Sequence, residues 1–248
     1  IYGNLTFSTG MTVNAGANTT TFAATSGTQV ITTNGKSMDF PITFAGTATY
    51  QLADALTSGS SRTITLTSGT LDLNNLTLTT GLFSSSNSNT RSILFGTTGN
   101  ITLSGTGTVW TTATITNFSL TGTPTVNLTD SSATARSVSQ GAGTSAQAIS
   151  VYVKSGTGQV NFGGTNGVFQ NIDFTGSTAV CNLGNSIIVY GNLLFTANAT
   201  TVSSGLTLAA SSGTQTITSN GFTCDFSITI SSSGTVQLVD ALTSGSTR

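Results

Sequence analysis

The chain has 248 residues, with 6 Lys and Arg, 7 Asp, no Glu, no His and a formal net charge of −1. Thr (53), Ser (34), Gly (29) and Asn (19) together make up more than half of the sequence. So few basic residues exclude the basic surface that nucleic-acid binding needs, and a hydrophobic content of 36% excludes charged disorder. Because β-branched Thr is abundant and the usual surface helix formers are scarce, the composition predicts an all-β protein.

Short stretches of alternating apolar and polar residues predict strands along the chain, in order at 63–67, 70–73, 76–79, 125–129 and 149–153. Turn signals that contain Gly follow or separate them, as at 68–69, 80–81 and 155–156. Alternation places the apolar side chains of a strand on one face and its Thr and Ser side chains on the other. We therefore expect six aliphatic side chains of the first strands to point inward: Ile64, Leu66, Leu71, Leu73, Leu76 and Leu78.

The chain also contains a long internal repeat. Residues 26–62 and 212–248 align without a gap at an offset of 186, and 23 of the 37 positions are identical. We divide the chain into one full repeat unit at 1–188 and the first third of the next unit at 189–248, and expect it to be a piece of a longer continuous array. The repeat predicts that Asp39 and Asp225, and likewise Asp54 and Asp240, occupy equivalent corners.

A shorter period lies within the long one. The pattern of Asn, apolar, any residue, apolar and then Ser or Thr begins at Asn4, Asn75, Asn100, Asn117, Asn171 and Asn192. Most of the gaps fit multiples of a coil of about 20–25 residues, which is typical of solenoid repeats. The sequence therefore predicts a parallel β-helix, or β-solenoid, and the alternative is a series of tandem β-sandwich units.

Three phrases of the sequence, at 27–44, 69–81 and 79–96, resemble the Thr/Asn/Gly-rich repeat segments of large phage structural (fibre) proteins and bacterial surface adhesins. The resemblance covers nearly the whole chain, and it lies in texture and recurring phrases rather than in a catalytic motif. It implies a right-handed parallel β-helix that forms an elongated, exposed and protease-resistant stalk or fibre.

No residue pattern indicates catalysis, a cofactor or a metal. Without His there is no imidazole base or metal ligand, and neither Cys belongs to a CxxC pair. We interpret the repeated acids Asp54 and Asp240 as residues that cap short turns. Asp130 and Asp173 occur once each and are candidate calcium ligands, although they lack the spacing of a dedicated loop.

The two cysteines could pair, but we favour two buried free thiols at Cys181 and Cys224, because the repeat places Met38 at the position of Cys224. The longest apolar run, Ile187 to Tyr190, is far shorter than the ~20 residues of a membrane helix. We expect no membrane insertion and no nucleic-acid partner.

The leading hypothesis is a non-enzymatic structural repeat protein, an extracellular, cell-surface or virion fibre whose partners are copies of itself or further repeats of the same chain. The alternative is a glycan- or surface-binding adhesin module that uses aromatic residues such as Trp110 and Tyr152. The third hypothesis is a β-helical polysaccharide-degrading enzyme, whose carboxylates would include Asp54 or Asp173.

Overall fold

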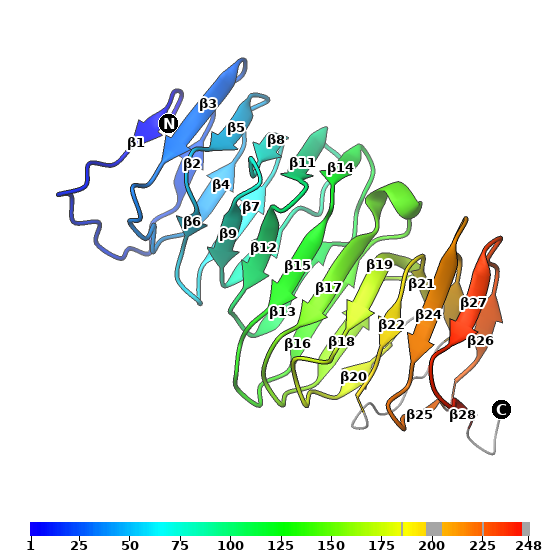
Figure 1. Ribbon diagram of the computed structural model, residues 1–248. Coiled ribbons are helices and arrows are strands. Elements are labelled where there is room, and N and C mark those ends of the chain that lie inside the picture. Colours follow the sequence, from blue (N-terminus) through cyan, green and yellow to red (C-terminus); the bar gives the residue numbers. More distant parts are fainter. Residues whose placement is uncertain (185, 197–204, 225, 245–248) are drawn as a thin grey trace. The chain divides into compact units, whose positions relative to one another are not determined.

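The computed structural model describes residues 1–184, 186–196, 205–224 and 226–244, and it shows a β-solenoid of parallel strands (Figure 1). The helical element among them is the 3₁₀ turn η1 (Ser145–Gln147). The chain forms two compact units. The N-terminal unit comprises residues 1–105 and 109–126, and the C-terminal unit comprises residues 106–108 and 127–248. The predicted repeat boundary at residue 188 lies inside the second of these units.

The strands are short, as the alternating stretches predicted. Those up to residue 128 are β1 (Leu5–Thr6), β2 (Thr20–Phe22), β3 (Thr28–Thr32), β4 (Ile42–Phe44), β5 (Thr49–Leu52), β6 (Leu56–Thr57), β7 (Thr63–Leu66), β8 (Gly69–Asp72), β9 (Thr77–Thr80), β10 (Leu82–Ser84), β11 (Arg91–Gly96), β12 (Asn100–Leu103), β13 (Gly107–Thr112), β14 (Phe118–Gly122) and β15 (Thr125–Leu128). The later ones are β16 (Arg136–Gln140), β17 (Ile149–Val153), β18 (Val160–Gly163), β19 (Gly167–Asp173), β20 (Cys181–Asn182), β21 (Ile187–Val189), β22 (Leu193–Leu194), β23 (Leu206–Leu208), β24 (Thr214–Thr218), β25 (Thr223–Cys224), β26 (Ile228–Ile230), β27 (Thr235–Leu238) and β28 (Thr243–Ser244).

Each strand pairs in parallel with the equivalent strand of the next coil. In the N-terminal unit the stacks are β1-β3-β5-β8-β11-β14, β2-β4-β7-β10-β13 and β6-β9-β12. In the C-terminal unit they are β16-β18-β20, β17-β19-β21-β23-β26, β22-β24-β27 and β25-β28. Parallel pairing of this kind excludes the antiparallel sandwich alternative.

The residue spacing between paired strands confirms a coil close to the predicted length. The shortest printed step, from Thr63 to Leu82, is 19 residues, and the longest, from Phe83 to Trp110, is 27. Most steps fall between these limits, such as Thr49 to Thr70. The strands keep their register while the corners take up the difference in length.

The core of each unit is built from the inward residues of these strands. Of the six aliphatic residues expected to point inward, Ile64, Leu66, Leu71, Leu73 and Leu78 are fully buried. Leu76 is only partly buried, because it directly follows a corner at which Asn74 and Asn75 adopt positive φ angles of 50° and 64°. The assignment of faces is therefore confirmed within the strands and fails at this corner.

Not every Thr faces outward. Thr33, Thr80 and Thr112 are fully buried, and their hydroxyl groups form hydrogen bonds inside the fold. Thr80 Oγ1, for example, lies 3.1 Å from the Arg62 carbonyl oxygen, to which it donates. A buried hydroxyl with a partner is tolerated in a core.

The two sequence copies build the same local structure. In the first copy Asp54 Oδ1 accepts hydrogen bonds from Thr33 N (2.8 Å) and Thr33 Oγ1 (3.0 Å). In the second copy Asp240 Oδ1 accepts from Ser219 N at 2.7 Å, which is the same contact 186 residues later. Asn34 and Asn220 also match, since both have a positive φ and donate from Nδ2 to the carbonyl oxygen of a Phe in the preceding coil.

These contacts confirm that Asp54 and Asp240 occupy equivalent corners. They also correct the predicted role, because each carboxylate bonds to the preceding coil, about 21 residues away in sequence, rather than to its own turn. Asp39 forms an ion pair with Arg62, in which Nε lies 2.7 Å from Oδ1. Its predicted equivalent, Asp225, lies outside the described residues.

Replacing a buried aliphatic residue should cost far more than replacing an outward Thr. We expect Leu71→Ala to lower the free energy of unfolding by about 2–5 kcal/mol, because Leu71 is fully buried, and Thr65→Ser to change it by less than about 0.5 kcal/mol. Urea unfolding followed by circular dichroism measures both. Equal losses at the two positions would show that the Thr face is buried in an assembly.

The corner contact between Thr33 and Asp54 should also stabilise the fold measurably. Asp54→Ala leaves the buried Thr33 N–H and hydroxyl without this acceptor, so we expect a loss of about 1–3 kcal/mol in unfolding free energy. Thr33→Ser is the matched control, since Ser219 occupies this position in the other copy. A Thr33→Ser loss as large as that of Asp54→Ala would contradict the equivalence of the two corners.

Candidate functional site

The single-copy acids Asp130 and Asp173 each cap their own turn. Asp130 Oδ1 accepts from Ser132 N (3.1 Å) and Ser132 Oγ (2.6 Å), and Asp173 Oδ1 accepts from Thr175 N (2.8 Å) and Oγ1 (2.6 Å). Within the described part of the chain, no three Asp or Cys side chains lie close enough together to hold a metal ion. The structure thus places these two candidate calcium ligands in local turns rather than bringing them together with other acidic groups.

Both cysteines are buried and free of a disulfide bond. Burial raises the pKa of Cys224 to about 11, and burial together with the neighbouring Cys224 raises the pKa of the Cys181 thiol strongly. Both sulfurs are therefore protonated thiols at neutral pH, and neither has the thiolate character that nucleophilic chemistry or metal binding requires.

The two aromatic residues considered for sugar binding have different environments. Trp110 is fully buried and stacks on Phe83 with ring centroids 4.9 Å apart, so it belongs to the core of the N-terminal unit. Tyr152 is partly exposed on β17, and the ammonium nitrogen of Lys154 lies 4.6 Å from the centre of its ring. Of this pair, only Tyr152 presents a ring to solvent.

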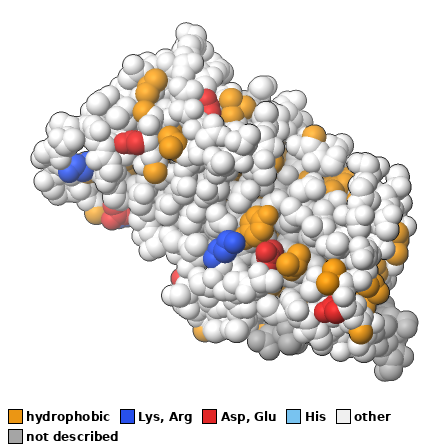
Figure 2. Space-filling view, in the orientation of Figure 1, with side chains coloured by type: hydrophobic (Ala, Val, Ile, Leu, Met, Phe, Trp, Pro, Cys, Tyr) orange, Lys and Arg blue, Asp and Glu red, His pale blue; other side chains and the backbone are white. Residues whose placement is uncertain are grey.

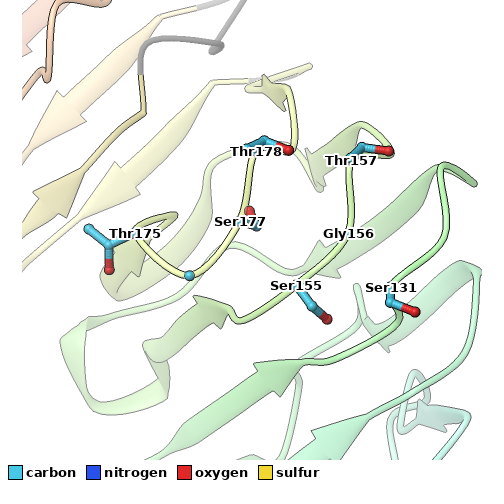
Figure 3. Close-up of a pocket in the computed structure, with 8 residues that line it drawn as sticks. Ser131, Ser155, Gly156, Thr157, Thr175, Ser177 and Thr178 are labelled. Atoms are coloured by element: carbon cyan, nitrogen blue, oxygen red, sulfur yellow. The ribbon is translucent and has the colours of Figure 1, made fainter.

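The largest concave feature of the C-terminal unit is a shallow groove that begins one residue after Lys154. Its volume is about 440 Å³, and hydroxyl groups and backbone line it. The lining residues come from three corners of successive coils: Ser131, then Ser155, Gly156 and Thr157, then Thr175, Gly176, Ser177 and Thr178 (Figure 3). We call this feature the Ser/Thr groove.

Part of the Ser/Thr groove is fixed by hydrogen bonds between coils. Ser155 Oγ donates to the carbonyl oxygens of Thr129 (2.7 Å) and Asp130 (3.2 Å) of the preceding coil. The backbone N–H groups of Thr157 and Gly158 both lie 3.3 Å from the Ser132 carbonyl oxygen. The corners are therefore held against each other rather than left as independent loops.

A buried arginine lies next to the groove, and the sequence reasoning missed it. Arg136 is the first residue of β16 and has 0% exposure. The signal was present, because Arg136 has the same strand parity as the inward Val138, just as Arg91 has the same parity as Ile93 and Phe95. Alternation thus predicts inward arginines, and only the assumption that charge faces water conceals them.

The visible surface carries little charge. Figure 2 shows isolated acidic and basic side chains on a face that is otherwise mostly backbone and uncharged polar groups. Among the described residues, no helix is long and apolar enough to span a membrane. The surface offers no dense charged area from which a partner could be deduced.

Comparisons with protein-family models, with curated proteins and with solved structures find no match for this chain. No residue role is therefore carried over from a relative. The functional evidence consists of the stacked coils, the corner contacts, the Ser/Thr groove and the buried arginine beside it.

Proposed function

We propose that this chain is a non-enzymatic structural repeat protein that forms part of a fibre or stalk at an extracellular, cell or virion surface. The observation that carries this proposal is the recurrence of one corner geometry in two sequence copies, at Asp54 and at Asp240. A coil that can be repeated without redesign adds about 4.8 Å of length each time. Length then depends only on the number of coils.

The chemistry of the described side chains supports a mechanical role. The acids Asp54, Asp130, Asp173 and Asp240 accept hydrogen bonds from backbone N–H groups, and the thiols are buried. Groups engaged in this way stabilise corners, whereas a general acid or base needs an open position at a substrate. The adhesin alternative loses Trp110 to the core and keeps Tyr152.

Location tests the structural role directly. Antibodies raised against the full chain should label a projecting fibre at regular intervals in electron micrographs of the intact source particle or cell, because tandem repeats place the same epitope at a fixed spacing. Label confined to the cell interior would overturn the proposal. A glycan array that gave specific binding, lost on Tyr152→Ala, would favour the adhesin instead.

We also propose that another coil, from a further repeat or a second copy, covers the outer surface of β26 and β27. Ile230 and Leu238 are 64% and 50% exposed there, while their equivalents Phe44 and Leu52 are fully buried in the first copy. In that copy β7 and β8 pair with β4 and β5 and cover them. Exposed apolar residues on unpaired parallel strands favour pairing with another chain.

The chain should therefore associate as its concentration rises. We expect sedimentation velocity to show oligomers at high concentration, and the double substitution Ile230→Thr, Leu238→Thr to shift the distribution toward monomer. Thr229→Ser, on the same strand, is the control and should leave association unchanged. A wild-type chain that remains monomeric at high concentration would contradict the covering coil.

A further inference from the structure

Arg136 is a buried cation whose hydrogen bonds are incompletely made. Its Nη1 donates to the Asp130 carbonyl oxygen at 3.2 Å, whereas Nε and Nη2 are buried and have no hydrogen-bond partner. Burial lowers the pKa of Arg136, and the nearby charge of Asp130 opposes that change. A buried guanidinium with unmade bonds is costly, so its surroundings call for an acceptor.

The other buried arginine shows what a complete set of partners looks like. Arg91 lies six residues after Ser85, as Arg136 lies six residues after Asp130, and both bond to the carbonyl oxygen of that earlier residue. In Arg91 all three guanidinium nitrogens donate to protein oxygens, such as those of Asn89 and Thr116 from Nη1. The corner before Arg91 therefore satisfies its arginine internally, and the corner before Arg136 does not.

The two unpartnered nitrogens of Arg136 form a specific recognition edge. The Nε–H bond and one Nη2–H bond of a guanidinium are parallel, and this fork matches the two oxygens of a carboxylate, sulfate or phosphate group. A single water oxygen cannot occupy both positions with the same geometry. The missing partner is thus best supplied by an oxyanion.

The Ser/Thr groove lies beside this edge, across Gly156. Gly156 lines the groove and has a φ of +89°, and a Cβ atom on it would lie 2.8 Å from Arg136 Nη2 and 2.6 Å from the Asp130 carbonyl oxygen. Any side chain here would therefore fill the space between the groove and the guanidinium. Glycine keeps that space free of side-chain atoms, and Figure 3 shows Ser131 and Ser155 near it.

We propose that Arg136 and the Ser/Thr groove form an oxyanion-binding site, in which a carboxylate, sulfate or phosphate group bonds to Nε and Nη2 while hydroxyl groups of the groove hold the rest of the ligand. Asp130 is the nearest acid and weakens anion binding by repulsion. Lys154, exposed and directly preceding Ser155, adds positive charge close to the groove. The ligand is either a free ion or the acidic group of a sugar chain.

Calorimetric titration of the full chain with sodium sulfate, at constant ionic strength in a chloride background, tests the site. We expect saturable binding at one site per chain, weakened at least tenfold by Arg136→Met. Gly156→Ala should weaken it similarly while leaving the guanidinium in place, because its methyl group fills the gap. Asp130→Asn should tighten binding, and Arg91→Met is the matched control that should leave the affinity unchanged.

A second titration with a sulfated oligosaccharide distinguishes the two sources of the anion. Tighter binding than inorganic sulfate, with competition between the two, assigns the site to an acidic glycan, whereas equal affinity per sulfate assigns it to the free ion. The proposal is overturned if the wild-type chain shows no saturable binding of either probe, or if Arg136→Met or Gly156→Ala folds and binds as the wild type does. Because the wild-type result alone can overturn it, the proposal does not depend on the variants folding.

Discussion

Backbone hydrogen bonding between parallel strands of successive coils is the constraint on which the rest of each unit depends. It fixes Thr49 opposite Thr70 and Ile42 opposite Ile64, so that inward residues of one coil lie directly over inward residues of the next. The aromatic pair Phe22 and Phe44, with ring centroids 5.2 Å apart, follows from this register. Packing is thus a consequence of strand pairing, and each coil needs its neighbours to complete its core.

The corners carry a second set of contacts that holds the coils in register where strands end. Asn4, Asn75, Asn171 and Asn192 each accept, through the side-chain oxygen, a hydrogen bond from a backbone N–H group of the next coil. The Asp54 and Asp240 carboxylates bond to the preceding coil in a comparable way. Short polar side chains therefore do at the corners what backbone groups do within the strands.

Much of this architecture could be predicted from the sequence, because strand periodicity and the 186-residue repeat are both consequences of the stacking itself. Alternation identified Leu71 and Leu78 as core residues, and the repeat placed Asp54 and Asp240 in equivalent corners. Contacts between coils could not be predicted in the same way, since a residue such as Thr33 meets its partner only after a full turn of the chain. For the same reason Arg136 and the groove next to it carried no recognisable motif, as they combine residues from three coils.

The variation in coil length has a consequence for how such a chain tolerates change. Paired strands are separated by as few as 19 residues, between Thr63 and Leu82, and by as many as 27, between Phe83 and Trp110, while register within the strands is kept. An inserted residue inside a strand would turn every later side chain of that strand to the opposite face. An insertion at a corner only enlarges an exposed loop. Loops can therefore lengthen, shorten and diversify at the corners over evolutionary time, or accept a grafted peptide, while the stack beneath them is unchanged.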